Sequence, residues 1–313
     1  MGKKRPLPIL LMPVYKGGVM FEQAIDSVIP CLPWFSRVVI SLNGNDTHED
    51  RAIAVGLAGH CDLTLLETRR ILNPVQHLHF IAKYLSQKML LAPDSQLFVL
   101  CHDDLLYKPG FDHLDQKQWE VWGSDCISLG DYHVFKDDTS LVKHRDECWF
   151  ARYDSQTSRS KQAFLMTQYQ RNDDPFTNFS GMRFSLSLLR STIRFFTMTG
   201  SNTGMRLEYS LIVNRQVKVI KNFNPPLVAV REHSGSAGAK VTRSDFTASE
   251  LRYGSWIWVN CESPASLKQI YHGQYGPKGM ARLVRISLLH RYYELLGWAR
   301  LLLVSGGLIR SHD

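Results

Sequence analysis

The chain has 313 residues, of which 44% are hydrophobic and 21% are charged, and this composition excludes a disordered, collagen-like or coiled-coil protein. Its formal net charge is +8, of which Lys3, Lys4 and Arg5 supply three charges. Residues 261–313 supply four more, since seven basic side chains there face three acidic ones. The remaining body is left with a net charge of only +1, which argues against nucleic acid as a partner.

The cysteines and the apolar segments indicate a reducing compartment and no membrane-spanning helix. The closest two of the six cysteines are 22 residues apart, so none has the paired spacing of a zinc site. No run of 18 uncharged apolar residues occurs, and Pro6, Pro8 and Pro13 interrupt the segment where a signal peptide needs an apolar stretch. We therefore expect a cytoplasmic protein with reduced thiols.

Residues 7–14 form a short apolar run bounded by prolines, which predicts a buried strand. The turn at 15–18 and the apolar positions through Ile29 predict that a helix follows. The same alternation recurs with a strand at 37–42, a polar segment and a short helix that ends at Leu57. This order is typical of repeated strand–helix units.

The third strand is expected at 62–67. The helix after it should be capped by Asn73, with Pro74 at its first position. A fourth apolar run at 97–101 ends this part of the chain. Short apolar strands that alternate with helices predict a mostly parallel sheet that is buried on both faces.

His102-Asp103-Asp104 directly follows the fourth predicted strand. Ligands of open parallel sheets bind beyond the carboxyl ends of the strands, so these side chains are candidate binding residues. One carboxylate could bind a divalent cation while the other orients a ribose or a lysine, and a hard oxygen site of this kind suits Mg²⁺ or Mn²⁺ carried by a diphosphate. The alternative is that the acidic pair only caps the following turn.

Four segments resemble, in order and spacing, the nucleotide-binding half of a family 2 glycosyltransferase. They are PILLMPVYKGG, FEQAIDSVI, VVISLNGND and LFVLCHDDLLYKPGF; the likeness covers residues 7–111 and continues more thinly to about residue 240. The resemblance implies an α/β fold of the glycosyltransferase A type, which is a Rossmann-like sandwich with a mostly parallel central sheet, here followed by C-terminal helices. It also implies bacterial surface-polysaccharide synthesis, such as O-antigen (lipopolysaccharide) or capsule.

Carried over by position, the resemblance assigns roles to the strand ends. It places Pro13, Val14 and Tyr15 beside the nucleobase. It turns Asp103 toward the ribose or the sugar, and it makes Asp104 the metal ligand.

The second predicted strand departs from the family pattern. The family usually has an aspartate there that contacts the base, whereas this chain has Leu42 followed by Asn43-Gly44-Asn45-Asp46. Either Asn43 or Asp46 would then make the contact, and the identity of the base stays open, with UDP- and dTDP-linked donors preferred.

Transfer of the sugar with inversion at its anomeric carbon requires a catalytic base beside the acceptor hydroxyl, on the face opposite the leaving diphosphate. The family places a carboxylate near the start of a helix with a leucine three residues later, and Glu208 with Leu211 matches this pattern. The alternative is an ordinary surface ion pair of Glu208 with Arg206 or Arg215. The rival candidates for the base are Asp173 and Asp174.

Three later residues complete the expected site. Gly181 resembles the small-residue loop that lets the backbone approach the donor sugar, and simple turn formation is its alternative. Arg231 and His233 resemble the late histidine motif of this fold. His233 would reach the metal and Arg231 the diphosphate, while a purely structural histidine is the alternative.

We divide the chain into residues 1–111, the nucleotide-sugar-binding half; 112–240, the acceptor-binding and catalytic half of the same domain; and 241–313, a C-terminal helical and basic extension. The polar segment 149–179 predicts a long loop. Residues 283–309 combine arginines with aliphatic and aromatic side chains. They predict a helix that either lies on an anionic membrane surface or packs on the core or on a second copy.

Together these features predict an inverting transferase that moves a sugar from a nucleotide diphosphate donor to a saccharide or lipid-linked saccharide, assisted by Mn²⁺ or Mg²⁺. The enzyme would be cytoplasmic, and it would be peripheral on the inner face of the plasma membrane if residues 283–309 form the membrane-binding helix. The turn at 15–18 lacks the glycine-rich fingerprint of a dinucleotide oxidoreductase. A non-catalytic sugar-binding, lectin-like or scaffolding relative of the same fold is the alternative.

Overall fold

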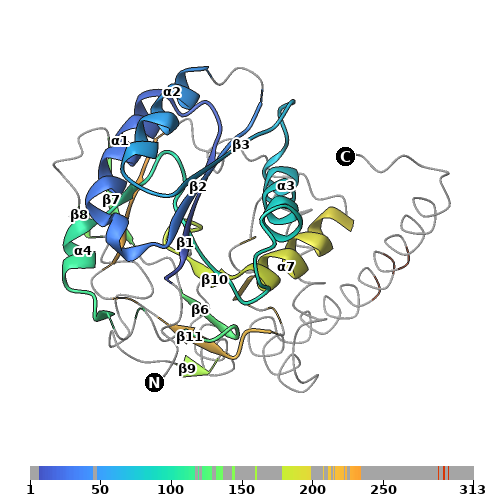
Figure 1. Cartoon of the computed structure of the whole chain (residues 1–313). Coiled ribbons are helices and arrows are strands. Elements are labelled where there is room, and N and C mark those ends of the chain that lie inside the picture. The colour runs from blue at the N-terminus through green and yellow to red at the C-terminus, as the bar shows by residue number, and fades with distance from the viewer. Residues whose placement is uncertain are drawn as a thin grey trace.

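A five-stranded sheet with the order β10-β4-β1-β2-β3 lies at the centre of the computed structural model (Figure 1). Its strands are β1 (Ile9–Val14), β2 (Arg37–Leu42), β3 (Leu63–Glu67), β4 (Gln96–Val99) and β10 (Arg183–Ser185). The first four are parallel, whereas β10 pairs antiparallel with β4. The predicted α/β fold with a mostly parallel central sheet is therefore confirmed.

The described part of the chain is nearly continuous through residue 116 and consists of shorter pieces after it. It comprises residues 7–44, 48–116, 119, 122–128, 132–136, 143–144, 159–160, 178–198, 207, 211–212, 214, 216–221, 223, 226–233, 288, 292 and 295. Most of the predicted loop at 149–179 and most of the predicted helix at 283–309 lie outside these residues.

Helices cover both faces of the central sheet (Figure 1). One face carries α1 (Gly18–Val28) and α2 (His48–Gly56), and the other carries α3 (Pro74–Gln87) and α7 (Leu186–Met198). Successive side chains of β1 point to opposite faces, so Leu10 packs in the core with α1 while Leu11 packs in the core with α3. The short helices are η1 (Ile29–Trp34), η2 (Leu57–Gly59) and α4 (Lys108–Asp112).

The start of α3 has the predicted cap. The Asn73 side chain accepts a hydrogen bond from the Gln76 backbone N–H, and the Gln76 side chain accepts one in return from the Asn73 N–H. Pro74 occupies the first turn, where a missing N–H costs nothing. This reciprocal pair satisfies two donors that the helix itself cannot pair.

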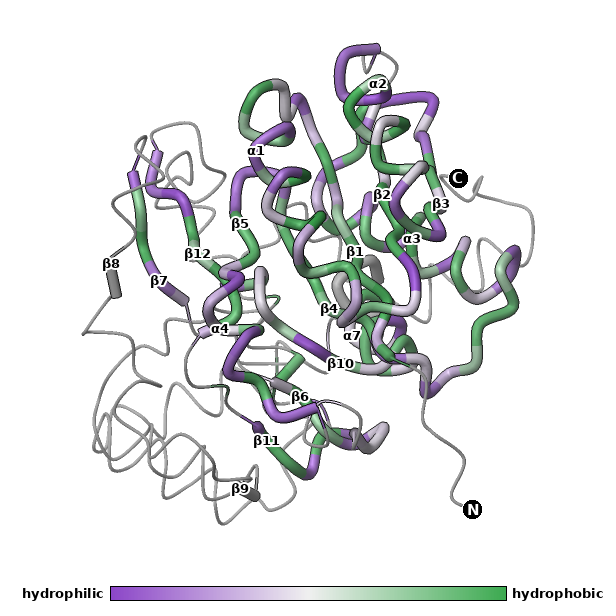
Figure 2. The backbone as a smooth tube through the Cα atoms, turned by 60° about the vertical axis from the view of Figure 1, so that its left-hand side comes forward, coloured by the Kyte–Doolittle hydropathy of each residue, from purple (hydrophilic) through white to green (hydrophobic). Residues whose placement is uncertain are grey.

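Two smaller sheets contain the remaining described strands. One has the order β6-β11-β9, with bounds Cys126–Ser128, Val219–Lys221 and Arg159–Ser160. The other has the order β5-β12-β7-β8, with bounds Leu105–Leu106, Val228–Arg231, Tyr132–Phe135 and Lys143–His144 (Figure 2). Because β12 pairs antiparallel with β5, which begins directly after Asp104, residues 231–233 lie beside the end of β4.

Arg183 is a buried cation at the start of β10. Its guanidinium lies between two indole rings, 4.6 Å from the centroid of Trp119 and 4.3 Å from that of Trp122. Its Nη1 donates a 2.7 Å hydrogen bond to the Trp119 carbonyl oxygen. Burial lowers the pKa of Arg183 to about 9, so the group stays charged at neutral pH and depends on these contacts.

His77 is enclosed between α3 and β2. The side chain is 4% exposed, and a 2.8 Å hydrogen bond joins its Nε2 to Ser41 Oγ. Burial lowers the pKa of His77 from 6.5 to about 4, because the charged imidazolium cannot be hydrated there. The folded protein therefore holds a neutral His77 at pH values where the unfolded chain already binds a proton.

This difference predicts an acid-dependent loss of stability. As the pH falls from 7 to 4, proton uptake by the unfolded chain should lower the free energy of unfolding by about 3 kcal/mol through His77 alone. Urea denaturation across this range measures the effect. His77→Gln, which stays neutral and can still bond Ser41, should show a pH dependence weaker by that amount. An identical pH dependence in the two proteins would contradict the assignment.

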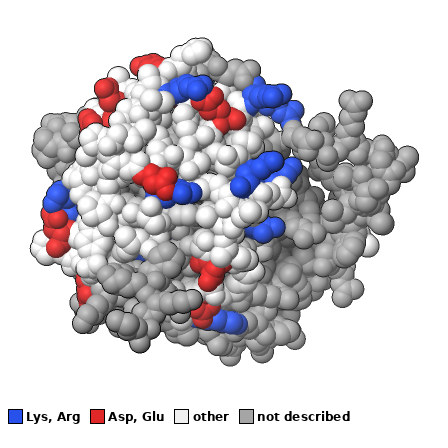
Figure 3. All heavy atoms as spheres, viewed as in Figure 1, with Lys and Arg blue, Asp and Glu red and all other residues white. Residues whose placement is uncertain are grey.

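Acidic and basic side chains of the described residues are interspersed over most of the face seen in Figure 3, as expected for a nearly neutral body. Within the described residues, no helix has both the length and the apolar composition needed to cross a membrane. Leu288, Tyr292 and Leu295 are helical and exposed, and they are the described positions of the predicted helix at 283–309. The division into regions 1–111, 112–240 and 241–313 stays a prediction.

Candidate functional site

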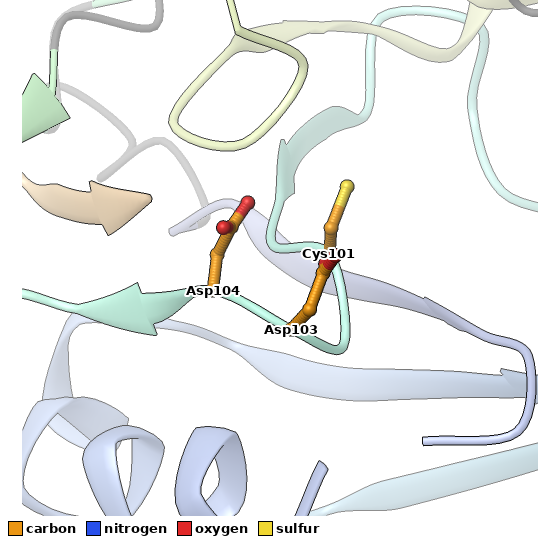
Figure 4. A group of neighbouring side chains, drawn as sticks. All are labelled: Cys101, Asp103 and Asp104. Atoms are coloured by element: carbon orange, nitrogen blue, oxygen red, sulfur yellow. The ribbon is translucent and has the colours of Figure 1, made fainter. Parts of the chain in front are cut away.

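The turn between β4 and β5 carries the group of side chains that the sequence singled out. Ligand atoms of Cys101, Asp103 and Asp104 all lie within 4.8 Å of one another (Figure 4). The turn follows the carboxyl end of a central parallel strand, which is where ligands of open α/β sheets bind. The structure therefore places the predicted acidic pair at a suitable edge of the sheet.

Asp104 is buried, and both of its carboxylate oxygens accept hydrogen bonds from distant parts of the chain. Ser180 Oγ donates to Oδ2 at 2.5 Å, and the backbone N–H of Arg231 donates to Oδ1 at 2.9 Å. Burial and, after it, the charge of Asp103 raise the pKa of Asp104 to about 7, against the opposing effect of these hydrogen bonds. Asp104 thus ties the residue 178–182 loop and β12 to the acidic turn.

Asp103 is partly exposed, and its carboxylate pairs with His233, which follows β12. Its Oδ2 lies 2.9 Å from His233 Nε2, and the two side chains are 19% and 17% exposed. Solvent and small ligands can therefore reach this pair, in contrast to Asp104, which is 4% exposed. The structure brings together Asp103 and His233, which are 130 residues apart in the sequence.

Arg231 has its guanidinium engaged within the chain. Its Nε donates to the main-chain oxygen of Asp103 at 3.1 Å, and its Nη2 donates to Gln23 Oε1 of α1. The guanidinium also stacks 4.6 Å from the centroid of the Phe135 ring, and the residue is 7% exposed. In this arrangement Arg231 fixes the backbone of the acidic turn, whereas the sequence assigned it to the diphosphate.

The loop at 178–182 lies directly against the acidic turn. Gly181 has a positive φ of +85°, which favours glycine, and its N–H donates to the Val99 oxygen at 2.8 Å. Ser180 Oγ accepts a 2.9 Å hydrogen bond from the Cys101 N–H while donating to Asp104. The sequence indicates Gly181 as a site residue but not Ser180, because a serine in a small-residue segment carries no signal of such a distant partner.

The turn after β1 contains the predicted base-contacting residues. Val14 is buried in the core, whereas Pro13 is half-buried and Tyr15 is 41% exposed beyond the strand end. Asp50 of α2 fastens the turn, since its two carboxylate oxygens accept hydrogen bonds from the N–H groups of Gly17 and Gly18 at 3.1 and 2.8 Å. Sequence reasoning missed Asp50, whose only local signal is an acidic residue in the first turn of a helix.

Asn43, at the end of β2, uses its side-chain amide inside the protein. Its Nδ2 donates to the Leu72 oxygen and its Oδ1 accepts from the Leu72 N–H, both at 2.8 Å. Thr68 Oγ1 adds a 3.3 Å hydrogen bond to the same Oδ1. These contacts hold the segment after β3 against β2, so they support a positioning role for Asn43 in addition to the predicted contact with the base. Asp46, the other residue predicted to contact the base, lies outside the described residues.

Removing these contacts should destabilise the fold. Asn43→Ala leaves the partly buried N–H and C=O of Leu72 without their partner, and we expect a loss of about 2 kcal/mol in the free energy of unfolding. Asn43→Asp, which can accept from Leu72 but cannot donate to it, should lose a smaller amount. Urea denaturation compares the variants, and a midpoint of Asn43→Ala equal to that of the native chain would show that the bonds contribute nothing.

Three carboxylates proposed for catalysis, Glu208, Asp173 and Asp174, lie outside the described residues. Leu207 and Leu211 flank Glu208, and both are helical and buried, with exposed fractions of 2% and 0%. The predicted helix is therefore present at these two positions. The role of Glu208 stays a prediction.

Comparison with known proteins defines the fold. No family model and no curated protein matches the chain. Among solved structures, the chain is similar to GalNAc-T7 crystallised with UDP, GalNAc and Mn²⁺, with 11% identity, a TM-score of 0.50, and coverage of 91% of this chain and 57% of that chain. It is also similar to residues 1–349 of TarS from S. aureus, with 10% identity, a TM-score of 0.51, and coverage of 86% of this chain and 70% of that chain.

Both neighbours are glycosyltransferases of the glycosyltransferase A type, and this protein has that fold. It spans a little over half the length of the GalNAc-T7 chain. The acidic turn of this chain lies at the end of a central parallel strand of that fold.

Proposed function

We propose that this protein is a glycosyltransferase that moves a sugar from a nucleotide diphosphate donor to a hydroxyl group of a saccharide or lipid-linked saccharide. The observation that carries the proposal is the pair formed by Asp103 and His233 at the carboxyl end of β4, in a glycosyltransferase A fold. Both side chains are partly exposed, so a donor bound beyond the strand ends can reach them.

The side chains at this turn fit a divalent cation. Carboxylate oxygens suit Mn²⁺ and Mg²⁺, and a neutral imidazole can add a nitrogen ligand. Because both oxygens of Asp104 accept hydrogen bonds within the chain, we assign the metal to Asp103 and His233, and we give Asp104 a positioning role. The ion, when bound, would stabilise the negative charge of the leaving diphosphate.

The rest of the donor would lie across the neighbouring strand ends. The exposed ring of Tyr15, with Pro13 beside it, would contact the base of a UDP- or dTDP-linked donor. The Gly181 backbone would approach the sugar, since a glycine adds no side chain there. Arg231 would keep the acidic turn in place through its contact with the Asp103 carbonyl.

The chemical step that we propose is an inverting transfer. Glu208 would take the proton of the acceptor hydroxyl, whose oxygen attacks the anomeric carbon from the face opposite the diphosphate. The sugar–phosphate bond breaks as the new glycosidic bond forms. We place this reaction in O-antigen or capsule synthesis at the cytoplasmic face of the membrane, with residues 283–309 near the lipid surface.

Thermal unfolding of the full chain tests the donor site. UDP or dTDP together with Mn²⁺ should raise the Tm, because a ligand at about 100 times its Kd adds about 2.7 kcal/mol of stability. The corresponding nucleotide sugars should release nucleotide diphosphate when an acceptor is supplied. Glycan binding without any effect of nucleotide or metal would identify a sugar-binding protein instead, and a complete lack of nucleotide-sugar binding and turnover overturns the proposal.

A further inference from the structure

The acidic turn offers a third donor atom that the proposed function does not use. Cys101 Sγ lies within 4.8 Å of a carboxylate oxygen of Asp103 and of Asp104. Two ligands on opposite sides of one ion are separated by about 4.5 Å when metal–sulfur and metal–oxygen bonds are about 2.3 and 2.2 Å long. Cys101 and Asp103 are therefore close enough to share an ion after a small adjustment of their side chains.

The backbone holds Cys101 in this position. Its N–H donates a 2.9 Å hydrogen bond to Ser180 Oγ, and the N–H of the preceding Leu100 donates to the Leu11 oxygen of β1 at 3.0 Å. The side chain is partly buried and points from the turn in the same direction as that of Asp104 (Figure 4). The backbone of Cys101 is thus held in place, and its thiol lies within 4.8 Å of a carboxylate oxygen of Asp103, the proposed ligand.

We propose that Cys101 is a ligand of the metal site and makes that site selective for thiophilic divalent ions. This inference rests on the proposed function, which places a cation at Asp103 and His233. The thiol would join that site through Asp103, since the ligand atoms that lie within 4.8 Å of one another are those of Cys101, Asp103 and Asp104. Carboxylates alone favour Mg²⁺, Ca²⁺ and Mn²⁺, whereas a thiolate and an imidazole shift the preference toward Co²⁺, Zn²⁺ and Cd²⁺. On binding, the Cys101 S–H bond breaks, its proton passes to solvent, and the sulfur lone pair forms the bond to the metal.

Cobalt provides a direct readout of sulfur ligation that does not depend on activity. Metal-free full-length protein is titrated with Co²⁺ in the presence and absence of UDP, and the near-ultraviolet absorption is followed. A thiolate bound to Co²⁺ gives a sulfur-to-metal charge-transfer band, which oxygen and nitrogen ligands do not give. We expect the band in the native chain and in the control Cys61→Ser, whose thiol lies after η2, away from the acidic turn.

Two variants at Cys101 separate ligation from a structural role. Cys101→Ser should lose the band and bind Co²⁺ at least about tenfold more weakly, since even residues that only support metal ligands change affinity by this factor. Cys101→Asp supplies an oxygen in place of sulfur. Its affinity for Mg²⁺ relative to Cd²⁺ should be higher than that of the native chain, as measured by competition titration. An unchanged Tm of the variants in the absence of metal would show that their fold is intact.

The outcomes distinguish this inference from the proposed function. If UDP binds with Co²⁺ but no charge-transfer band forms, or if the band survives in Cys101→Ser, Cys101 is not a ligand and only the present inference fails. If the band forms in a Cys101-dependent way while no nucleotide binds, the metal site stands and the donor proposal fails. If the native chain binds no Co²⁺ with or without UDP, the inference is overturned.

Discussion

Replacing Asp103 with asparagine is expected to lower kcat/KM for nucleotide-sugar turnover by about a thousandfold, which equals about 4 kcal/mol of lost transition-state stabilisation. The amide keeps the shape of the carboxylate but carries no charge, so it weakens both the metal site and the pair with His233. Steady-state kinetics measures the loss. The rise in Tm that Mn²⁺ gives together with UDP should disappear, while the Tm without ligand changes little because Asp103 is partly exposed.

Asp62→Asn is the matched control, because Asp62 is an exposed aspartate whose partner is Arg37, at 2.6 Å. It should leave kcat/KM and the ligand-induced Tm shift unchanged. Asp104→Asn should lower stability through its contacts with Ser180 and with the Arg231 backbone. If Asp103→Asn retains full activity while Asp104→Asn loses it at an unchanged Tm, the metal belongs to Asp104 instead.

Truncation of Arg183 should be among the most destabilising substitutions in the described core. Arg183→Ala removes the group that fills the space between Trp119 and Trp122 and leaves the Trp119 carbonyl without its donor. We expect the free energy of unfolding to fall by about 4 kcal/mol, the range found when large buried side chains are truncated. Equilibrium urea denaturation measures this loss.

Arg190 of α7 provides the comparison, since it is an exposed arginine in the adjoining helix. Arg190→Ala should change stability by no more than about 0.5 kcal/mol. Arg183→Lys keeps the charge but loses the planar stack, so it should lie between the two alanine variants. Equal stabilities of Arg183→Ala and Arg190→Ala would show that the indole contacts of the buried guanidinium are energetically unimportant.

The sequence predicted the first half of the central sheet well because its strands are short apolar runs that alternate with helices. Residues 37–42 were predicted as a strand, and β2 has these bounds. The sequence does not predict β10. Its apolar pattern favours a helix that contains Phe184 together with Leu186 and Leu188, whereas in the structure Phe184 lies in β10 and the helix begins at Leu186. A three-residue strand has no measurable periodicity, and Arg183 contradicts the expectation that a buried strand position is apolar.

The candidate site could be predicted where a motif is local and could not where a contact is distant. Asp103 and Asp104 stand at the end of an apolar run, which marks them as candidates. The proposed exchange of their roles depends on Ser180 and the Arg231 backbone, which contact Asp104 from 76 and 127 residues away. Asn43 shows the same limit, because nothing near it in the sequence indicates a bond to Leu72.

The antiparallel pairing of β12 with β5 determines when the site can form during folding. His233 and the backbone of Arg231 reach the acidic turn only when residues 228–231 have joined β5, so a chain that ends before them has the central parallel strands but lacks the Asp103–His233 pair. During synthesis from the N-terminus, the proposed metal-binding edge is therefore among the last described parts to be completed. Metal affinity would thus report that the late strand has docked, and a nascent chain with only its first half folded should be unable to retain the donor.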